Sequence, residues 1–444
     1  KREDYTAGKG VPSGNGNIVF LYAVNAQNAS VEGKGTVDGN GLAFYNGKGD
    51  NTGPGQGGLG GNFDRPHLFI FYQCDNLHLQ NTFFKASAYH CVRILKCKQV
   101  YIDGIRIYNR VNRNNDGFHF NDCEYVHIIN CDVQCQDDAC ALFGSNKFVT
   151  VTNCSFSTRW SIFRFGGGES QNIAVTNCLI YDTYGCPIKI SAGRASIENF
   201  TFSNIIMRNV TGPIGIGFSG PSDNSNNNAQ STSKPFIRNI VFNAIRATVV
   251  AKPVDHQDIH FGVSVREGEK NSCITLNAMG AYYLENISFT DVHVKYAGGG
   301  TTEQANKVVP NEAAEYFGVW NYPPGGPPAY GMYARNVKGL SLQNVRFEYD
   351  EPDARPAIIF DNIEDATING LSAKGNSGNE LLRFINSKDV LLTGTKVLTP
   401  AATFLRVMGS SSECIVVDGG DIRKASQKVI FENGATKTAV TLNT

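Results

Sequence analysis

The sequence has no excess of charge of either sign. Its 444 residues include 40 Lys plus Arg and 40 Asp plus Glu, so the formal net charge is zero, and only 18% of residues are charged. Without a positive field, a chain has no general means of collecting nucleic acid or an anionic membrane surface. We therefore expect no nucleic-acid partner.

Long apolar runs are also missing. No stretch of about 18 consecutive apolar residues occurs, so we expect no membrane span. The chain begins at Lys1 and shows no signal peptide, so we expect a processed or trimmed chain, and a secreted or periplasmic monomer. Five Asn-x-Ser/Thr triplets permit glycosylation: Asn28, Asn153, Asn199, Asn209 and Asn286.

Motifs for bound groups are absent as well. Ten of the twelve cysteines lie between Cys74 and Cys186, but none forms a Cys-x-x-Cys pair, which argues against zinc knuckles. The Gly-rich stretch 47–62 has no Lys-Ser/Thr after it and no strand-to-helix context, so it does not resemble a phosphate-binding loop. We expect no cofactor and no metal.

What the sequence does contain is a repeat. A short sequence motif recurs along the chain: Cys or Asn, then two residues, then alternating apolar positions. It begins at Cys74, Cys97, Cys123 and Asn146, and once more at Ser170, where Ser takes the first place. Repeats of about this length mark stacked architectures, and 47 Gly, 27 Phe and 18 Tyr suit many short strands joined by turns. We predict an all-β fold: a right-handed parallel β-helix with three parallel sheets, forming a single domain over residues 1–444.

Cysteines recur at equivalent places of successive coils. Three Asn-Cys pairs recur at the spacing of the repeat: Asn130-Cys131, Asn153-Cys154 and Asn177-Cys178. We interpret them as small buried side chains stacked inside a narrow core, with disulfides between stacked pairs as the alternative. Related strand phrases continue almost to the C-terminus. Three stretches break the rhythm and are predicted to be loop excursions that could wall a cleft: 47–62, 220–234 and 297–328.

Acidic residues recur at the spacing of one coil. Asp138, the second acid of Asp137-Asp138, follows Asp116 by 22 residues, so we expect three carboxylates on one patch of adjacent coils. Crowded like charges raise the pKa of at least one acid while another stays ionised. Glycoside hydrolysis needs that division between a proton donor and a base. The alternative is that these acids only cap backbone amides in turns.

An ordered set of motifs carries a family resemblance, which is clearest over residues 65–190. The set comprises Arg65-Pro66-His67-Leu68, Tyr72-Gln73-Cys74, Asn114-Asn115-Asp116-Gly117, Gln136-Asp137-Asp138 and Pro187-Ile188-Lys189. With these motifs the chain resembles glycoside hydrolase family 28, the polygalacturonase and rhamnogalacturonase family. The resemblance implies a right-handed parallel β-helix that hydrolyses glycosidic bonds with inversion.

The resemblance also implies roles for the acids. Asp137 matches the general acid, and Asp116 and Asp138 match the pair that activates water. Asn115 stands where the family has Thr and is a candidate substrate-binding residue. Two departures are present: the family's Gly-His-Gly reads Thr158-Arg159-Trp160, and its Arg-x-Lys clamp for the sugar carboxylate keeps only Lys189.

Five more residues are candidates for substrate binding, each with a structural alternative. Arg159 could bind substrate or only neutralise the acids, and Arg164 could replace the lost clamp arginine or serve structure. Lys189 is expected to be exposed in the groove. Trp160 could stack on a sugar or fill the core, and His90, one coil before Asp116, could reach the site or be a surface histidine.

Three functions remain open from the sequence. The first is an inverting glycoside hydrolase that acts on a plant or microbial polysaccharide, pectin-like galacturonan or rhamnogalacturonan. The second is a polysaccharide lyase that binds Ca²⁺ through the acids and uses Arg159 or Lys189 as its base. The third is a non-catalytic carbohydrate-binding β-helix, because loss of the family His and Arg is also what decay of an active site would produce.

Overall fold

The computed structural model describes residues 6–13, 16–44, 65–193, 196–218, 234–252, 254, 268–309 and 326–443. The chain divides into two compact units, residues 1–189 with 253–265 and residues 190–252 with 266–444. The single domain expected from the sequence stays a prediction. Each unit consists of strands stacked in parallel on the strands of the next coil.

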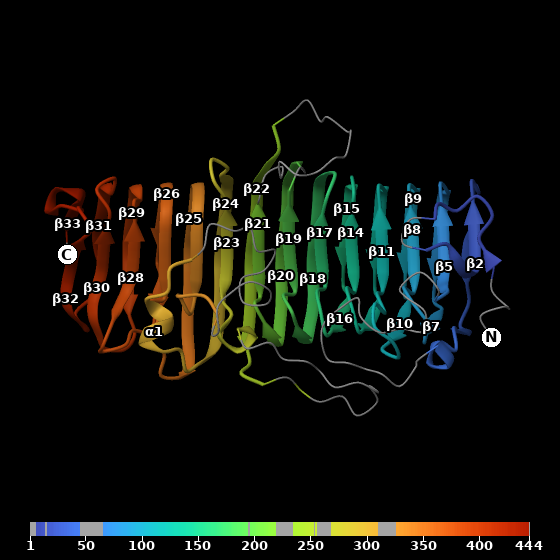
Figure 1. The fold of residues 1–444 in the computed structure, drawn as a ribbon, viewed down its shortest axis with the longest axis horizontal. Helices are drawn as coiled ribbons and strands as arrows, with labels where there is room; N and C mark the ends of the chain where they lie inside the picture. Colours follow the sequence, from blue (N-terminus) through green and yellow to red (C-terminus); the bar gives the residue numbers. More distant parts are fainter. Residues whose placement is uncertain are drawn as a thin grey trace. The chain divides into compact units, whose positions relative to one another are not determined.

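Three parallel sheets make up the first unit. Figure 1 shows four neighbouring strands of one of these sheets, β5, β8, β11 and β14. The first sheet contains β2 (Ile18–Val24), β5 (His67–Tyr72), β8 (Val92–Leu95), β11 (Phe118–Asn121), β14 (Cys140–Phe143) and β17 (Phe163–Gly166). The second contains β3 (Ser30–Glu32), β6 (Asp75–Gln80), β9 (Lys98–Asp103), β12 (Glu124–Ile129), β15 (Lys147–Thr152) and the start of β18 (Glu169–Tyr184). The third contains β4 (Thr36–Asp38), β7 (Phe83–Lys85), β10 (Arg106–Asn109), β13 (Asp132–Cys135), β16 (Ser155–Thr158) and the end of β18.

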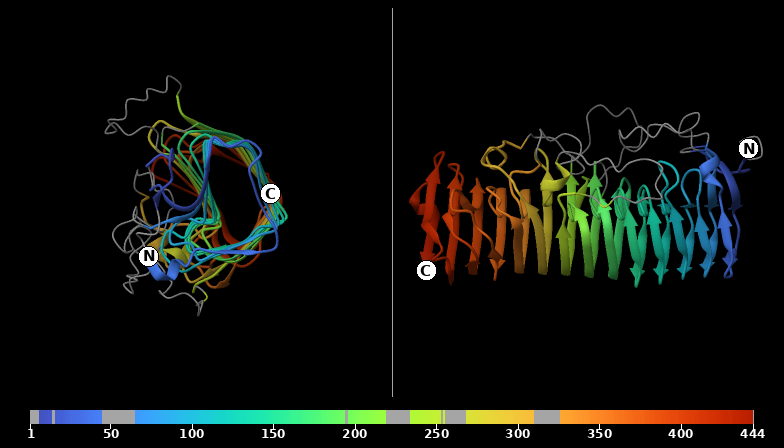
Figure 2. Two further views of the ribbon diagram at one scale, coloured as in Figure 1. Left: turned by 90° about the vertical axis from the view of Figure 1, so that its right-hand side faces the viewer. Right: turned by 90° about the horizontal axis from the view of Figure 1, so that it is seen from below.

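The exception to parallel pairing is β1 (Thr6–Ala7), which is antiparallel to β2. Within the second sheet Val100, Val126 and Val149 are in register and fully buried. Their neighbours along each strand point outward, because side chains in a strand alternate with a period of two. The end-on view in Figure 2 shows the blue and cyan coils of this unit one behind another.

The Asn-Cys ladder lies at the turn between the second and third sheets. Asn130, Asn153 and Asn177 have φ of 57°, 53° and 53°, a left-handed conformation that Asn tolerates better than most residues. The cysteine after each Asn is buried, and all twelve cysteines are free thiols, of which only Cys414 is exposed. These free, buried thiols support the interpretation as stacked core side chains over the disulfide alternative.

The second unit repeats the arrangement with strands that range from 2 to 20 residues in length. They are β20 (Ser196–Thr211), β21 (Ile214–Phe218), β22 (Phe236–Val249), β23 (Ile274–Ala278), β24 (Leu284–Gly298), β25 (Met332–Glu351), β26 (Ile358–Asn369), β27 (Ser372–Ala373), β28 (Glu380–Ile385), β29 (Lys388–Val397), β30 (Ala401–Met408), β31 (Glu413–Asp421), β32 (Ala425–Glu432) and β33 (Val440–Asn443). Strand β19 (Ile188–Ala192) contains the point at which the chain passes from the first unit to the second. Pairing in the second unit is parallel as well.

In the part of the chain that the structure describes, helical structure is confined to single turns. These are α1 (Thr302–Ala305) and the 3-10 turns η2 (Gly41–Phe44), η4 (Glu269–Asn271) and η5 (Lys437–Ala439). In α1 the Thr301 hydroxyl accepts from the backbone N–H of Gln304, and the Gln304 side chain accepts from that of Thr301, which caps the helix. No helix among the described residues is long and apolar enough to cross a membrane.

The structure describes the expected loop excursions only in part. Residues 47–62, and 220–234 except Lys234, lie outside the described residues. Of 297–328, the structure describes 297–309 and 326–328, where β24 continues to Gly298 and α1 follows. That excursion is therefore less irregular at its start than expected.

Candidate active site

The two acidic segments lie next to each other on adjacent coils of the first unit. Asp116 immediately precedes Gly117 and β11, and Asp137 and Asp138 lie between β13 and β14. The backbone N–H of Gly117 donates to the carbonyl oxygen of Asp138 at 2.9 Å. All three acids are buried. The structure therefore brings the three carboxylates together as the 22-residue spacing predicts.

Gly117 permits this close approach of the two coils. A Cβ atom at this position would collide with the carbonyl oxygen of Ala139 and lie 2.8 Å from Val133 and 3.0 Å from the Cys135 sulfur. Such distances are shorter than van der Waals contact, so a side chain here would push the coils apart. The Asp-Gly pair in the sequence thus reflects a steric demand beside the acid.

Neutral donors hold Asp137. The Asn114 amide donates to Asp137 Oδ2 at 3.2 Å, and the backbone N–H of Asp138 donates to Oδ1 at 2.9 Å. The Asn114 oxygen in turn accepts from Arg65 at 3.0 Å. Burial, and then the charges of Asp116 and Asp138, raise the pKa of Asp137 well above its ordinary value. A buried acid that keeps its proton near neutral pH suits proton donation.

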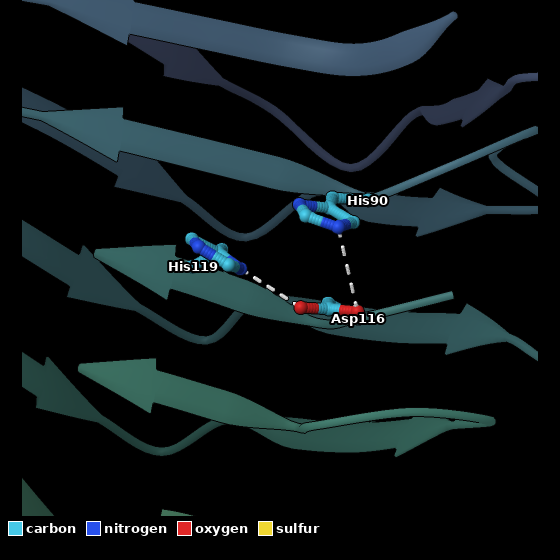
Figure 3. Close-up of side chains that lie close together, drawn as sticks. All are labelled: His90, Asp116 and His119. Carbon is cyan, nitrogen blue, oxygen red and sulfur yellow. Dashed lines mark hydrogen bonds and ion pairs between the residues drawn. The ribbon is translucent and has the colours of Figure 1, made fainter. Parts of the chain in front are cut away.

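Asp138 and Asp116 have partners of different kinds. Arg164 Nη1 lies 3.3 Å from Asp138 Oδ2, whereas two imidazole rings flank Asp116 (Figure 3). His119 Nδ1 lies 2.8 Å from Asp116 Oδ2, and His90 Nε2 lies 3.7 Å from Oδ1. Burial and the charge of Asp138 raise the pKa of Asp116 well above its ordinary value. The pair therefore has one carboxylate beside a cation and one beside two histidines.

Both histidines are held neutral. Burial, followed by the neighbouring His119 and His67, lowers the pKa of His90 well below its ordinary value. Burial and then Arg93 lower the pKa of His119 to about 3. The rings of His90 and His119 stack at 4.5 Å with an interplanar angle of 17°. His90 is therefore buried in the acid site and is not a surface histidine. Its contact with substrate stays a prediction.

His119 is the site residue that sequence reasoning missed. The available signal was the alternation Phe118-His119-Phe120, which turns His119 away from the core that its two neighbours enter. A lone histidine in a strand gave no reason to connect it with the acid three positions before it. Only the bend at Gly117 brings the ring back to Asp116.

His90, Asp116 and His119 are the group among the described residues that could hold a metal ion, since their ligand atoms lie within 4.8 Å of one another. The 2.8 Å contact between His119 and Asp116 is a hydrogen-bond distance. Arg93 adds positive charge beside both rings, joined by Arg65 at His90 and by Arg164 at His119. This charge opposes a cation, so the arrangement favours a hydrogen bond between His119 and Asp116, with the His90 ring stacked on that of His119.

Asn115 has a role different from the predicted substrate contact. Its oxygen accepts from the backbone N–H groups of Val111 (3.0 Å) and Asn112 (2.7 Å). Its amide donates to the carbonyl oxygens of Ser87 (3.0 Å) and Tyr89 (2.8 Å). These four bonds use the full capacity of the amide, and the residue is wholly buried. Asn115 therefore shapes the turn that presents Asp116.

The remaining predicted residues form a second, buried cluster. Trp160 is only 4% exposed, with Lys189 Nζ 4.9 Å and Arg159 Cζ 6.0 Å from the centre of its ring. Arg159 also donates to the carbonyl oxygen of Tyr184. The expectation that Lys189 is exposed was wrong: its exposed fraction is 0%. Cation–π contacts with Trp160 account for this burial, and they favour the core-filling role of the tryptophan.

Arg164 lies closer to solvent than these residues. Its side chain is 22% exposed while it pairs with Asp138, and its guanidinium lies 5.1 Å from the Phe143 ring centre. Of the predicted cations, it is the one that combines contact with an acid and partial exposure.

Comparison with known proteins agrees with this fold. Residues 6–314 match the family described as glycosyl hydrolases family 28. The fold is a right-handed parallel β-helix, and the chain belongs to this family. A family 28 exopolygalacturonase from Yersinia enterocolitica is structurally similar, with a TM-score of 0.54 and 14% identity over 83% of this chain and 67% of that protein.

Two curated relatives show the extent of the sequence similarity. A polygalacturonase of Fusarium fujikuroi is 27% identical over 256 residues, which are 52% of this chain and 66% of that protein. A polygalacturonase of Persea americana is 28% identical over 196 residues, or 42% and 41% of the two chains. The chain thus spans two thirds or less of the length of the curated relatives it matches.

Proposed function

We propose that this protein is an inverting glycoside hydrolase that cleaves a pectin-like polysaccharide, galacturonan or rhamnogalacturonan. The observation that carries the proposal is the trio of buried carboxylates on adjacent coils, in which burial raises the pKa of Asp137. Family membership and relatives named polygalacturonases support the substrate class.

The contacts of the three acids support a division of the steps among them. Asp137, held by neutral donors, protonates the departing glycosidic oxygen. Asp138, with Oδ2 beside Arg164, and Asp116 take the proton of the attacking water. Inversion requires the acid and base to stand roughly 6.5–9.5 Å apart so that water fits between them. Product would then form with the opposite anomeric configuration.

Arg164 is the candidate contact for a sugar carboxylate, because its planar guanidinium suits that group and its side chain is partly exposed. Arg159, Trp160 and Lys189 pack together as a buried cation–π cluster, which supports a structural role for them. We further propose secretion or a periplasmic location, where such polymers are met, and a monomeric state; sedimentation of the purified chain tests the latter.

The test measures turnover of Asp137→Asn and Asp138→Asn on polygalacturonan and rhamnogalacturonan. Each variant should lose about 10²-fold or more, because a positioned acid or base contributes ~10²–10⁴. A substrate with a highly acidic leaving group should partly rescue Asp137→Asn and leave Asp138→Asn impaired. Asp132→Asn is the control, since Asp132 lies on β13 and accepts from the Ser155 hydroxyl.

Three outcomes would contradict the proposal. Retained configuration in the first product, followed by NMR, would exclude inversion. Unsaturated product absorbing in the ultraviolet, with loss of activity in chelator, would indicate the lyase. Binding of these polymers with no turnover would indicate a carbohydrate-binding protein.

A further inference from the structure

We propose that His119 is a positioning residue that donates its Nδ1–H to Asp116 and so keeps that carboxylate ionised and oriented toward the attacking water. The inference rests on the proposed hydrolase function and assigns a residue that the family motifs described above do not include. It begins from the shortest side-chain contact of Asp116, 2.8 Å between His119 Nδ1 and Oδ2.

The fold fixes this contact from two sides. His119 lies in β11, in register with Arg93 of β8 and Ala141 of β14. Asp116 is held through its backbone, since its carbonyl oxygen accepts from Cys91 N–H at 3.1 Å and from the Asn109 amide at 2.9 Å. The backbones of both residues are therefore held by neighbouring coils, and this places the two side chains next to each other (Figure 3).

The site needs such a donor because Asp116 is in unfavourable surroundings for a charge. Burial and the charge of Asp138 both favour its protonated form. Arg164 hydrogen-bonds to Asp138 directly, whereas the shorter side-chain contact of Asp116 among the described residues is with the imidazole of His119. A hydrogen bond to the charged form of an acid favours that form, so His119 supplies to Asp116 part of what Arg164 supplies to Asp138.

The ring donates as a neutral group. Its pKa of about 3 leaves it uncharged over the range in which the carboxylates titrate. A neutral imidazole has one N–H, and placing it at Nδ1 directs it to the acid. Other charged or titratable groups that act on Asp116, His119 or their immediate neighbours are His67, His90, Tyr89, Asp137, Asp138, Arg65, Arg93 and Arg164.

His90 occupies a different position in this arrangement. Its Nε2 lies 3.7 Å from Asp116 Oδ1, beyond hydrogen-bond distance, and its ring packs against Tyr89 at 4.1 Å and against His119 at 4.5 Å. It therefore supports the His119 ring by stacking, and His90→Phe should disturb turnover less than His119→Ala.

The experiment compares His119→Ala, His119→Asn and His119→Gln. Asn places an amide N–H where the imidazole has Nδ1, whereas the Gln amide lies one carbon farther along the side chain. We expect His119→Ala to lower kcat about 10- to 100-fold, the usual effect of losing a hydrogen bond to a charged group, with KM changed less than about 3-fold. His119→Asn should recover most of the lost kcat and His119→Gln little of it.

The pH profile gives the readout that a packing role would not move. Loss of the donor favours protonated Asp116, so the acidic limb of kcat/KM should shift to higher pH in His119→Ala and return in His119→Asn. His127→Ala is the control: His127 lies on β12 and its Nδ1 contacts the Thr150 hydroxyl at 2.8 Å, away from the acids. Its kcat and profile should match wild type.

A readout independent of turnover separates this inference from the proposed function. With ¹³C-labelled Asp carboxyl groups and Asp116→Asn for assignment, NMR should show a higher Asp116 pKa in His119→Ala than in wild type. An unchanged or lower Asp116 pKa, or equal loss of kcat in the Ala, Asn and Gln variants, would overturn the inference. If wild type cleaves no pectic polymer, the proposed function fails while the NMR titration still decides the role of His119.

Discussion

Buried carboxylates occur in both units, but they are partnered differently. In the second unit Asp353 receives two parallel bonds from Arg355, Nε to Oδ1 at 3.0 Å and Nη2 to Oδ2 at 2.7 Å, and a third from Gly300 N–H at 3.0 Å. In the first unit Asp137 is held by an amide and a backbone N–H, close to two more acids.

The comparison distinguishes a structural acid from a reactive one. A bidentate guanidinium faces Asp353 with two parallel hydrogen bonds and supplies a buried countercharge. Neutral donors and neighbouring acids leave Asp137 able to hold a proton and release it. Glu380, which is wholly buried, follows the structural pattern, with Arg383 Nε at 2.6 Å and Arg406 Nη2 at 3.1 Å.

The largest expected difference is in stability. Asp353→Asn should lower the free energy of unfolding by about 3–5 kcal/mol, because it leaves the Arg355 guanidinium buried without its countercharge. Asp137→Asn should cost less than about 1 kcal/mol, because a neutral amide replaces a buried acid that holds its proton, and no buried charge loses its partner. Urea unfolding of both variants measures this, and similar losses in the two would remove the distinction.

A smaller effect is expected at two matched glycines. Gly117 lies just before β11 of the first unit, and Gly331 lies just before β25 of the second. A Cβ atom at Gly331 would lie 2.6 Å from the carbonyl oxygen of Ala357. Each Gly→Ala variant should lose about 1–3 kcal/mol of stability through overpacking. Only Gly117→Ala should also reduce turnover of the folded enzyme, because it displaces Asp116. Normal kcat in Gly117→Ala would show that the acids tolerate movement of this turn.

The smallest effect is a difference in the sign of pH dependence. The folded-state pKa values of Asp116 and Asp137 are raised, so the stability linked to them is present below their unfolded pKa and is lost as pH rises through the folded values. For Glu348 of the second unit, Arg346 and then His293 lower the pKa to about 2. Its contribution is therefore present above its ordinary pKa of 4.5 and lost as pH falls toward 2.

Unfolding measured from pH 3 to 8 tests both signs. The double variant Asp116→Asn/Asp137→Asn should lose stability less steeply than wild type as pH rises. Glu348→Gln should lose at most about 1 kcal/mol, and only at the higher pH values, because its partner Arg346 is largely exposed. A wild-type slope in the double variant would show that these two acids do not set the pH dependence.

Much of the site follows from the repeat. Once one coil is known to take 22 to 26 residues, Asp116 and Asp138 must be neighbours, and His90 must lie one coil before Asp116. The contacts of Gly117 with Asp138 and of Cys91 with Asp116 agree with that count. Exposure was harder to predict: Lys189 is buried against the Trp160 ring, and nothing in the sequence of β19, the strand of Lys189, indicates this contact.

The sequence by itself determined the β-helix, because period-two alternation and a repeat of coil length leave each coil with an apolar face that only its neighbours can cover. It also determined which acids meet. Only the tertiary structure decided which groups surround these acids. The chain bends at Gly117, and the His119 ring lies within hydrogen-bond distance of Asp116. The side-chain amide of Asn115 forms hydrogen bonds with four backbone groups. Side-chain hydrogen bonds depend on positions set to within a fraction of an ångström, and a repeat fixes positions only to within a residue.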